Sequence, residues 1–329
     1  MQRYSQELLA RIESPLEKIC PRRPLQGVLG HLWEQSILPW HTSNRLLWSP
    51  ANTGPLTVER QVLTIHDVAS LDHPEWFESR FARWYGWMTP ALVRRVRCVI
   101  TVSEFSKKRL VANTGMPESR VEVIPNGVSQ QFSPQEEGRI RDVRSRLKIP
   151  TDRYVLCVGS IEPRKNVSRL LEAWSLISHR LPKEVFLVVA GAAGKGHVFA
   201  TTNLGKMPAR VYPIGFVQEN DLPALYSGAL ALVYPSLYEG FGLPVLEAMA
   251  SGTAAIASET TALPEVTGDA ALLIDPLDVT AIAGGIERVV MDDTFRKQLG
   301  QRGIERSRYF TWQRAATSTL RVLRMADMM

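Results

Sequence analysis

The sequence predicts an α/β protein with two doubly wound, parallel-sheet domains, and three observations lead to this class. Short apolar runs that end in glycine or a polar residue alternate with stretches of helical periodicity. The runs are apolar throughout, which is typical of strands buried on both faces of a parallel sheet. The chain has 329 residues, whereas single domains most often have about 100–150. The length therefore suits two domains.

The second half of the chain carries the clearest pattern. Its predicted strands are "YVLCVGS", "VFLVVAG", "RVYPIGF", "ALALVYPS", "TAAIASE" and "AALLID". Between the first two lies "NVSRLLEAWSLISHRL", a predicted helix with Asn166 as its N-cap and an apolar stripe through Leu170, Leu171, Trp174 and Ile177. In the first half, "QVLTIHDVA", "CVITVSE" and "RVEVIPNGV" predict strands of a second parallel sheet.

Composition shifts suggest the domain boundaries. The polar segment Ser133–Thr151 is interpreted as a linker, which gives an N-terminal domain of residues 1–150 and a C-terminal domain of residues 151–310. The closing residues predict one more helix, capped by Thr311, with an apolar face through Trp312, Ala315, Leu320 and Leu323.

Composition excludes several classes of protein. With 45% hydrophobic and 22% charged residues the chain is globular. Its longest apolar runs are far shorter than the roughly 20 residues of a membrane-spanning helix, and no secretory signal opens it. Cys20, Cys98 and Cys157 lack the spacing of metal ligands, so we interpret them as reduced thiols of a cytoplasmic protein.

Positive charge is concentrated in the first half of the chain. Residues 1–150 hold 21 basic and 15 acidic residues, whereas residues 151–329 hold 18 of each. The segment Trp76–Leu110 combines several aromatic residues with eight basic and two acidic ones. This mixture suits an anionic membrane surface, or a helix with a packed aromatic face and a solvated basic face. No recognition motif supports nucleic acid as the partner.

The stretch "YPSLYEGFGLPVLEAMASG" places two carboxylates in a hydrophobic segment. Pro244 suits the first turn of a helix that ends near Gly252. The amides of residues 240–244 would then form a donor-rich site for an anion or for sugar hydroxyls. Glu247 lies one turn inside this helix and could accept hydrogen bonds from vicinal hydroxyls, while Glu239 precedes it. Alternatively, both glutamates only complement the helix dipole, an effect of about 0.3–1 kcal/mol.

Two further sites are predicted at strand ends. In "VGSIEPRKN" a strand ends at Gly159, so Arg164 and Lys165 lie at the carboxyl edge of the sheet, where they could hold a diphosphate or simply be exposed. In "TIHDVA", His66 directly follows a strand of the first domain. A histidine there is either structural or catalytic.

The motif "EGFGLPVLE" is similar to the E-x7-E motif of the retaining glycosyltransferases of family 4, which have the GT-B fold. "GSIEPRKN", "ITVSEFSK", "VIPNGV", "IHDVA" and "YFTWQRAA" match the same family in the same order, so the resemblance covers nearly the whole chain. "LWSPANTGPL" and "HPEWF" look most like bacterial mannosyltransferases of polysaccharide and O-antigen assembly.

The resemblance implies a role for each candidate residue. Arg164 and Lys165 would neutralise the donor diphosphate, Glu247 would bind the ribose hydroxyls, and Glu239 would lie near the transferred sugar. The backbone of Gly240, Phe241, Gly242 and Leu243 would contact sugar and phosphate, and Gly159 would belong to the donor site. His66 would face the donor sugar, Asn126 and Gly127 would approach the linker, and the last helix would return to the N-terminal domain.

The resemblance also implies a metal-independent, cofactor-free reaction, and no DxD motif occurs in the sequence. Transfer is expected to follow a same-face path through an oxocarbenium-like state, in which the leaving phosphate helps to deprotonate the acceptor. GDP-mannose is favoured as the donor, with UDP-sugars as the alternative. The expected acceptor is a saccharide or a lipid-linked saccharide at the cytoplasmic face of the membrane.

The chain departs from the family at its start. It opens with "MQRYSQELLARI", whereas family members begin with a strand and a glycine-rich loop. The first sheet is therefore expected to lack a central strand and to expose edges. Either the reading frame starts late or the protein is a shortened, catalytically weak, donor-binding partner. A GT-B nucleotide-sugar epimerase is a further alternative, and an NAD oxidoreductase is disfavoured because no GxGxxG follows a strand.

Overall fold

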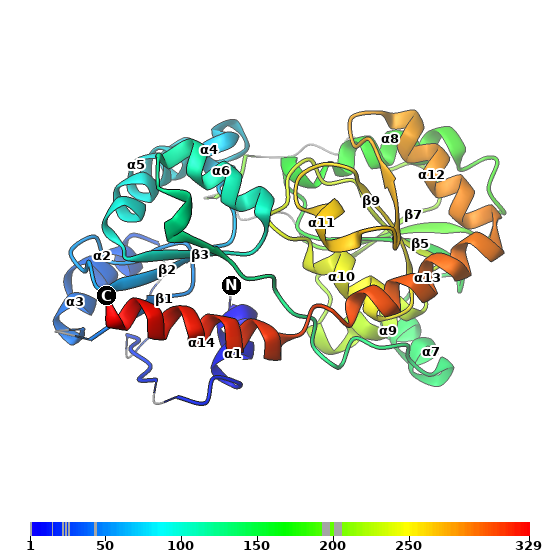
Figure 1. Cartoon of the computed structure of the whole chain (residues 1–329). Coiled ribbons are helices and arrows are strands. Elements are labelled where there is room, and N and C mark those ends of the chain that lie inside the picture. Colours follow the sequence, from blue (N-terminus) through cyan, green and yellow to red (C-terminus); the bar gives the residue numbers. More distant parts are fainter. Residues whose placement is uncertain are drawn as a thin grey trace. The chain divides into compact units, whose positions relative to one another are not determined.

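The computed structural model describes residues 2–14, 16–21, 23, 25, 27–42, 45–192, 198–200 and 206–329. It contains two compact units, which are drawn in Figure 1. Unit 1 comprises Met1–Pro74, Ser79–Gly127 and Trp312–Met329. Unit 2 comprises Glu75–Glu78 and Val128–Thr311. Each unit is a parallel sheet with its own helices, as the alternation of apolar runs and helical periodicity predicts.

Unit 1 is built on a four-stranded parallel sheet in the order β1-β2-β3-β4. Its strands are β1 (Leu47–Ser49), β2 (Gln61–Ile65), β3 (Cys98–Thr101) and β4 (Val121–Val123). Its helices are α1 (Gln2–Leu9), α2 (Val28–Ser36), α3 (Leu38–His41), α4 (Ala69–Asp72), α5 (Ser79–Arg95), α6 (Glu104–Thr114) and α14 (Trp312–Met328).

Helices cover both faces of this sheet because successive residues of β2 point to opposite sides. Leu63 and Ile65 pack in one core with Leu92 of α5 and Leu110 of α6. On the other face, where α1 and α14 pack together, the Tyr4 hydroxyl lies 3.5 Å from Thr64 Oγ1. All five residues of β2 are buried, as expected for a strand covered on both faces, and they include the polar Gln61 and Thr64 as well as three apolar residues.

The edge of the sheet at β1 borders a cavity. The cavity has a volume of about 1030 Å³, and its walls include Leu9 of α1, Trp48 of β1 and Leu320 of α14. Within the described part of the chain, strand β1 pairs only with β2, so the backbone groups of Trp48 that point away from β2 face this edge. Exposed edges are expected in this sheet from the sequence, whereas β1 itself is not among the predicted strands.

Unit 2 is built on a six-stranded parallel sheet in the order β10-β9-β8-β5-β6-β7. The strands are β5 (Tyr154–Val158), β6 (Phe186–Ala190), β7 (Val211–Gly215), β8 (Ala231–Tyr234), β9 (Ala254–Ser258) and β10 (Ala271–Ile274). The helices are α7 (Glu137–Arg146), α8 (Val167–Ile177), α9 (Leu222–Ser227), α10 (Leu243–Ala250), α11 (Leu263–Thr267), α12 (Val279–Met291) and α13 (Asp293–Ser307). All six strands predicted for this half are confirmed.

The strand order of unit 2 reverses between β5 and β8. Strands β6 and β7 follow β5 on one side, while β9 and β10 follow β8 on the other. Val155 packs in one core with Trp174 of α8 and Ile286 of α12, and Leu156 packs in another with Val245 of α10. With both faces covered, the reversal leaves an opening at the carboxyl ends of β5 and β8, where ligands bind in open α/β sheets.

Two local expectations differ from the structure. The segment 133–151, interpreted as a linker, belongs to unit 2, contains α7 and buries Val143 and Ile149 in that unit. Asn166 occupies the N-cap position of α8, but its φ is 58° and its side chain does not cap the helix. Its Nδ2 instead donates to the carbonyl oxygens of Pro235 at 3.0 Å and Pro276 at 2.6 Å.

The last helix has the predicted amphipathic pattern. Helix α14 begins at Trp312, directly after Thr311, and it buries Trp312, Ala315 and Leu323. Leu320 is half-buried. The carboxyl end of helix α14 is fixed within unit 1, because Arg97 Nη1 donates to the Ala326 carbonyl oxygen at 2.6 Å. The chain therefore returns at its end to the unit in which it begins.

Candidate active site

Two loops meet where the strand order of unit 2 reverses. One loop joins β5 to α8 (residues 159–166) and the other joins β8 to α10 (residues 235–242). The Leu237 N–H donates to the Arg164 carbonyl oxygen at 2.8 Å, which ties the loops together. The Asn166 bond to Pro235 adds a second link. Because the loops hold each other, the side chains they carry are positioned together.

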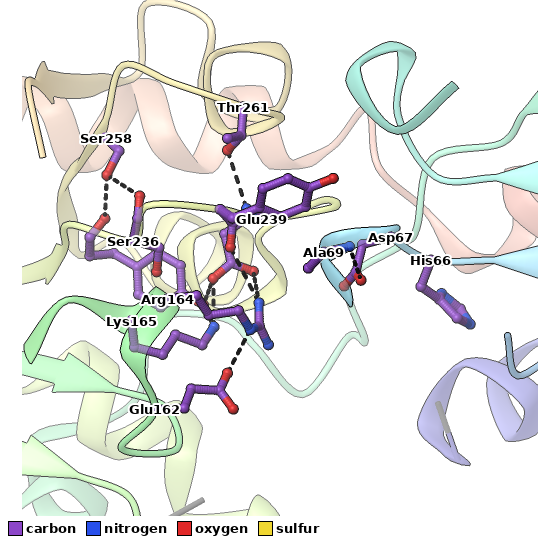
Figure 2. A network of polar contacts seen from close by, with 12 residues as sticks. His66, Asp67, Ala69, Glu162, Arg164, Lys165, Ser236, Glu239, Ser258 and Thr261 are labelled. Carbon is purple, nitrogen blue, oxygen red and sulfur yellow. Dashed lines mark hydrogen bonds and ion pairs between the residues drawn. The ribbon is translucent and has the colours of Figure 1, made fainter. Parts of the chain in front are cut away.

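These loops carry a compact cluster of charged side chains, shown in Figure 2. Glu239 Oε1 lies 2.6 Å from Lys165 Nζ, and Glu239 Oε2 lies 3.3 Å from Arg164 Nη1. The Tyr234 hydroxyl donates to Glu239 Oε1 at 2.9 Å and also contacts Lys165 Nζ. Arg164 lies between two carboxylates, since its Nε is 2.6 Å from Glu162 Oε1. The structure therefore brings Arg164, Lys165 and Glu239 together.

The environment keeps Glu239 ionised. Burial alone would raise its pKa, but Lys165 and Arg164 outweigh burial and lower the pKa to about 2. Burial lowers the pKa of Lys165, and Glu239 opposes that change. Burial and the Glu239 charge both raise the pKa of Tyr234, so its hydroxyl stays protonated and can donate. Two cations thus face a carboxylate that carries its charge at neutral pH.

Glu162 is a member of the cluster that the sequence analysis did not single out. The residue is 1% exposed, and Oε2 accepts no hydrogen bond from any residue that the structure describes. The signal available in the sequence was its place two residues before Arg164 in "EPRKN". The Tyr234 hydroxyl was missed as well, because a tyrosine at the end of a buried strand does not differ from an ordinary core residue.

The turn before α10 leaves several amides available. Among the described groups, none accepts a hydrogen bond from the N–H of Phe241, Gly242 or Leu243. Gly242 is the N-cap residue with φ 101°, and Pro244 is the second helical residue rather than the first. Gly252 follows the helix with φ 78°. The predicted donor-rich turn therefore exists, with its start one residue earlier than predicted.

Glu247 lies inside α10 and is buried. It is 4% exposed, and its Oε2 accepts a hydrogen bond from the Tyr226 hydroxyl of α9 at 3.1 Å.

Neighbouring loops approach closely at the glycines that end β5 and β6. A Cβ atom on Gly191 would lie 1.9 Å from the Gly159 carbonyl oxygen. Only glycine fits there, so the loops after β5 and β6 are held at backbone contact.

His66 belongs to unit 1 and is held by its own neighbours at the end of β2. The backbone N–H of His66 donates to Asn52 Oδ1 at 2.7 Å. The ring atom Nε2 lies 2.9 Å from the Pro50 carbonyl oxygen. A carbonyl oxygen only accepts, so Nε2 carries the proton and Nδ1 is left as an acceptor. Burial lowers the pKa of His66 to about 4, which makes the ring neutral at pH 7.

Asn126, which follows β4 in unit 1, is buried, and its Oδ1 accepts no hydrogen bond from the described residues.

Across the described ranges, three or more His, Cys, Asp or Glu side chains nowhere gather as a metal site would require. In the same ranges, no helix has the length and apolar character needed to cross a membrane.

Comparison with known families identifies both halves of the chain. The family described as "Glycosyl transferases group 1" matches residues 139–306, and "Glycosyltransferase Family 4" matches residues 33–132. O-antigen chain mannosyltransferase B of Escherichia coli is 32% identical over 273 residues, which cover 82% of this chain and 72% of the relative. Serotype-specific mannosyltransferase WbdA of the same species is 29% identical over 85% of this chain and 35% of its own length.

Solved structures show the same fold. WaaG, a glycosyltransferase involved in lipopolysaccharide biosynthesis, superposes with a TM-score of 0.73 at 16% identity, over 98% of this chain and 95% of WaaG. HepE of Anabaena, solved with UDP and glucose, gives a TM-score of 0.73 at 20% identity, over 92% of this chain and 84% of HepE. The two parallel-sheet units are thus those of the GT-B fold.

Proposed function

Because the chain belongs to glycosyltransferase family 4 and is similar to mannosyltransferases of O-antigen synthesis, we propose that it transfers a mannosyl group. The donor in this proposal is GDP-mannose, with a UDP-sugar as the alternative. The acceptor is a saccharide or a lipid-linked saccharide of a cell-surface polysaccharide. That the protein is a glycosyltransferase follows from the family, whereas the donor, acceptor and stereochemistry are the proposal.

The observation that carries the proposal is the pair of cations at the reversal of strand order. Arg164 and Lys165 lie beside each other at the carboxyl edge of the sheet, and both contact Glu239. A donor diphosphate has the charge and the hydrogen-bond acceptors to take the place of that carboxylate. The amides of Phe241, Gly242 and Leu243 add donors at the start of α10. These groups can stabilise the leaving diphosphate without a divalent metal.

In this mechanism Glu239 changes partners when the donor binds. The diphosphate takes up Arg164 and Lys165, and Glu239 turns to the hydroxyls of the transferred sugar. Glu247 binds the ribose hydroxyls. His66, neutral and with Nδ1 as an acceptor, receives a hydrogen bond from the sugar. The bond to the leaving phosphate breaks through an oxocarbenium-like state, the acceptor attacks the same face, and the phosphate takes its proton, so the configuration is retained.

The two parts of the chain divide the work in this proposal. Unit 1, which includes the last helix (predicted as 311–329), is the acceptor-side domain, and unit 2, whose main segment begins at Val128 rather than at the predicted residue 151, is the donor-binding domain. Supporting this division, the cation pair and the α10 amides lie in unit 2, while His66 lies in unit 1. The proposed site of action is the cytoplasm, with peripheral attachment to the cytoplasmic face of the membrane.

Thermal shift with a panel of nucleotides and nucleotide-sugars, without added metal, tests the proposal. A ligand at 100 times its Kd stabilises the native state by about 2.7 kcal/mol. We expect the nucleotides and nucleotide-sugars that carry one particular base to raise the melting temperature of the protein. The variants Glu247→Gln and Lys165→Gln should not show this increase. Glu259→Gln, an exposed glutamate of unit 2, is the matched control and should retain it.

Product analysis separates transfer from the alternatives. Mannosyl transfer to a saccharide acceptor, with the α-anomer of the donor retained, supports the proposal. An epimerised donor in the absence of acceptor would show a nucleotide-sugar epimerase instead. Folded protein that is stabilised by no nucleotide would contradict a functional donor site.

A further inference from the structure

Unit 1 exposes apolar side chains on three neighbouring helices. On α2 the exposed fractions are 74% for Val28, 62% for Leu29 and 56% for Leu32, and Trp40 of α3 is 84% exposed. On α5, Trp84 is 38% exposed and Trp87 is 57% exposed. We call Val28, Leu29, Leu32, Trp40, Trp84 and Trp87 the aromatic surface. Exposed apolar groups that gather in this way mark interaction sites.

The three helices form one continuous region of unit 1, as Figure 1 shows. The His31 ring of α2 lies 5.6 Å from the Trp84 ring of α5, and the Trp84 and Trp87 rings are 5.5 Å apart. Helix α3 follows α2 after the single residue Ile37. The aromatic surface therefore combines two parts of the chain. Residues 28–40 were not recognised from the sequence, whereas the segment Trp76–Leu110 was.

Helix α2 has the character of a helix without its partner. None of its nine residues is buried, although Val28, Leu29 and Leu32 share one face and helices of globular proteins normally bury such a face. Helix α5 buries Ala82, Met88 and Leu92 on its inner side. Its outer stripe is formed by Arg80, Arg83, Trp84 and Trp87, which line a shallow pocket of about 470 Å³.

The charges beside the aromatic surface are mostly of one sign. Helix α5 holds Arg80, Arg83, Arg94 and Arg95 and no acidic residue. Across α2 and α3 the acid is Glu34, which accepts a hydrogen bond from Thr53 at 2.7 Å and is thereby held toward unit 1. Indoles next to arginines are the combination that suits the interface of a bilayer with anionic head groups.

We propose that the aromatic surface is the face by which unit 1 docks on an anionic lipid bilayer. Its apolar side chains enter the boundary between head groups and acyl chains, while Arg80 and Arg83 contact lipid phosphates. This inference names the partner of the proposed transfer to a lipid-linked acceptor and rests on that function. A second copy of this chain fits less well, because a symmetric contact would place the arginines of α5 against their own copies.

Co-sedimentation with vesicles tests the proposal on the full chain without nucleotide-sugar. Vesicles of phosphatidylcholine alone are compared with vesicles that also contain phosphatidylglycerol. We expect binding to the anionic vesicles that weakens as salt is raised. The charge variant Arg80→Ser/Arg83→Ser should weaken partitioning by about fivefold for each arginine removed. The apolar variants Leu29→Ser/Leu32→Ser and Trp84→Ala/Trp87→Ala should weaken vesicle binding at low salt and at high salt.

Matched controls come from unit 2. Phe216 is 72% exposed and Arg308 is exposed, so Phe216→Ala and Arg308→Ser remove similar groups elsewhere. Both controls should bind vesicles as the unchanged chain does. Absence of binding to either vesicle, or equal losses in the controls, would overturn the proposal. Self-association without vesicle binding, removed by the apolar variants, would also overturn it in favour of a second copy.

Nucleotide binding is measured on the same proteins by thermal shift. If the chain binds vesicles through the aromatic surface but binds no nucleotide, the docking inference holds and the proposed transfer fails. If nucleotide binding persists while vesicle binding is absent, the transfer proposal stands and the docking inference is rejected.

Discussion

At the scale of single residues, His66 shows how a backbone contact sets a protonation state. Its Nε2–H donates to the Pro50 carbonyl oxygen, and the Tyr4 ring lies edge-on at 4.6 Å. Burial lowers the pKa of the ring to about 4 from 6.5. A proton on Nδ1 would remove the acceptor that we assign to the donor sugar, so the neutral ring is the functional form.

The lowered pKa predicts a loss of stability in acid. Between pH 6.5 and about 4 the unfolded chain binds a proton at His66 that the folded chain does not. The free energy of unfolding therefore falls as the pH drops through this window, by at most about 3 kcal/mol from this group. His66→Gln keeps an N–H for Pro50 and removes the titration. Urea unfolding at pH 7 and pH 4.5 should show a smaller acid loss for the variant.

The same measurement can contradict this assignment. If the unchanged protein and His66→Gln lose equal stability between pH 7 and pH 4.5, the folded state protonates His66 as readily as the unfolded chain does. His179→Gln, at an exposed position of unit 2, is the control for removing a histidine elsewhere. It should retain the acid loss of the unchanged protein.

Single residues were predictable where their chemistry is unusual for their place. Adjacent Arg164 and Lys165 after a buried strand, and Glu239 within an apolar stretch, could be recognised because such groups need a partner. Arg164 and Lys165 pair with Glu239, which a linear sequence does not show, because Glu239 lies 75 residues after Arg164 and 74 residues after Lys165. Tyr234 was missed because it resembles an ordinary core residue, and Glu162 because its place before Arg164 does not distinguish it from an exposed loop glutamate. Their importance follows from the contact geometry.

At the scale of elements, the start of α10 depends on Gly242. Its φ is 101°, and a Cβ atom would lie 2.4 Å from Leu263 Cδ2. The methyl group belongs to a side chain that can turn, so backbone strain is the larger obstacle, at about 1–3 kcal/mol. Gly242→Ala should lower the free energy of unfolding by about that amount in urea titrations, and it should weaken nucleotide binding because the amides of the turn move.

Gly284→Ala is the matched control for this prediction. Gly284 is exposed inside α12, and a Cβ atom there would meet no atom within 4 Å. Alanine in a helix interior is favoured over glycine by about 0.5–1 kcal/mol, so the control should gain stability and keep nucleotide binding. Equal effects of the two substitutions would show that the turn before α10 is not constrained.

Elements were predictable where periodicity is strong and failed where context decides. The strands of unit 2 have several apolar residues each and were all identified. Strand β1 has three residues, and it exists because β2 pairs with it. Asn166 fits the N-cap pattern, but the loop after β8 recruits its side chain instead. Helix α2 has the same kind of apolar face as an ordinary core helix, so the exposure of that face is visible only in the folded structure.

At the scale of the whole molecule, each unit has a core of its own. The core of unit 1 joins β2 and β3 to α5 and α6, while the cores of unit 2 lie on the two faces of its six-stranded sheet. Unit 1 is nevertheless assembled from distant parts of the chain, since α14 supplies the buried Trp312, whose ring lies 6.1 Å from that of Tyr4. The alternation of strands and helices predicted two sheets, but the contribution of α14 followed only from family resemblance.

Separate cores predict that damage to one unit stays in that unit. Trp312 is 2% exposed, and truncating it to alanine should cost unit 1 about 3–5 kcal/mol. Hydrogen exchange of Trp312→Ala should then show faster exchange in β2 and β3 and unchanged protection in β5 and β6. Nucleotide binding, which we assign to unit 2, should stay within about twofold of the unchanged protein because its local structure is preserved. Trp174→Ala, at a fully buried position of unit 2, should give the reverse pattern. If Trp312→Ala accelerates exchange equally in both sheets, the two units unfold as one cooperative body, and the prediction that damage stays in one unit is wrong.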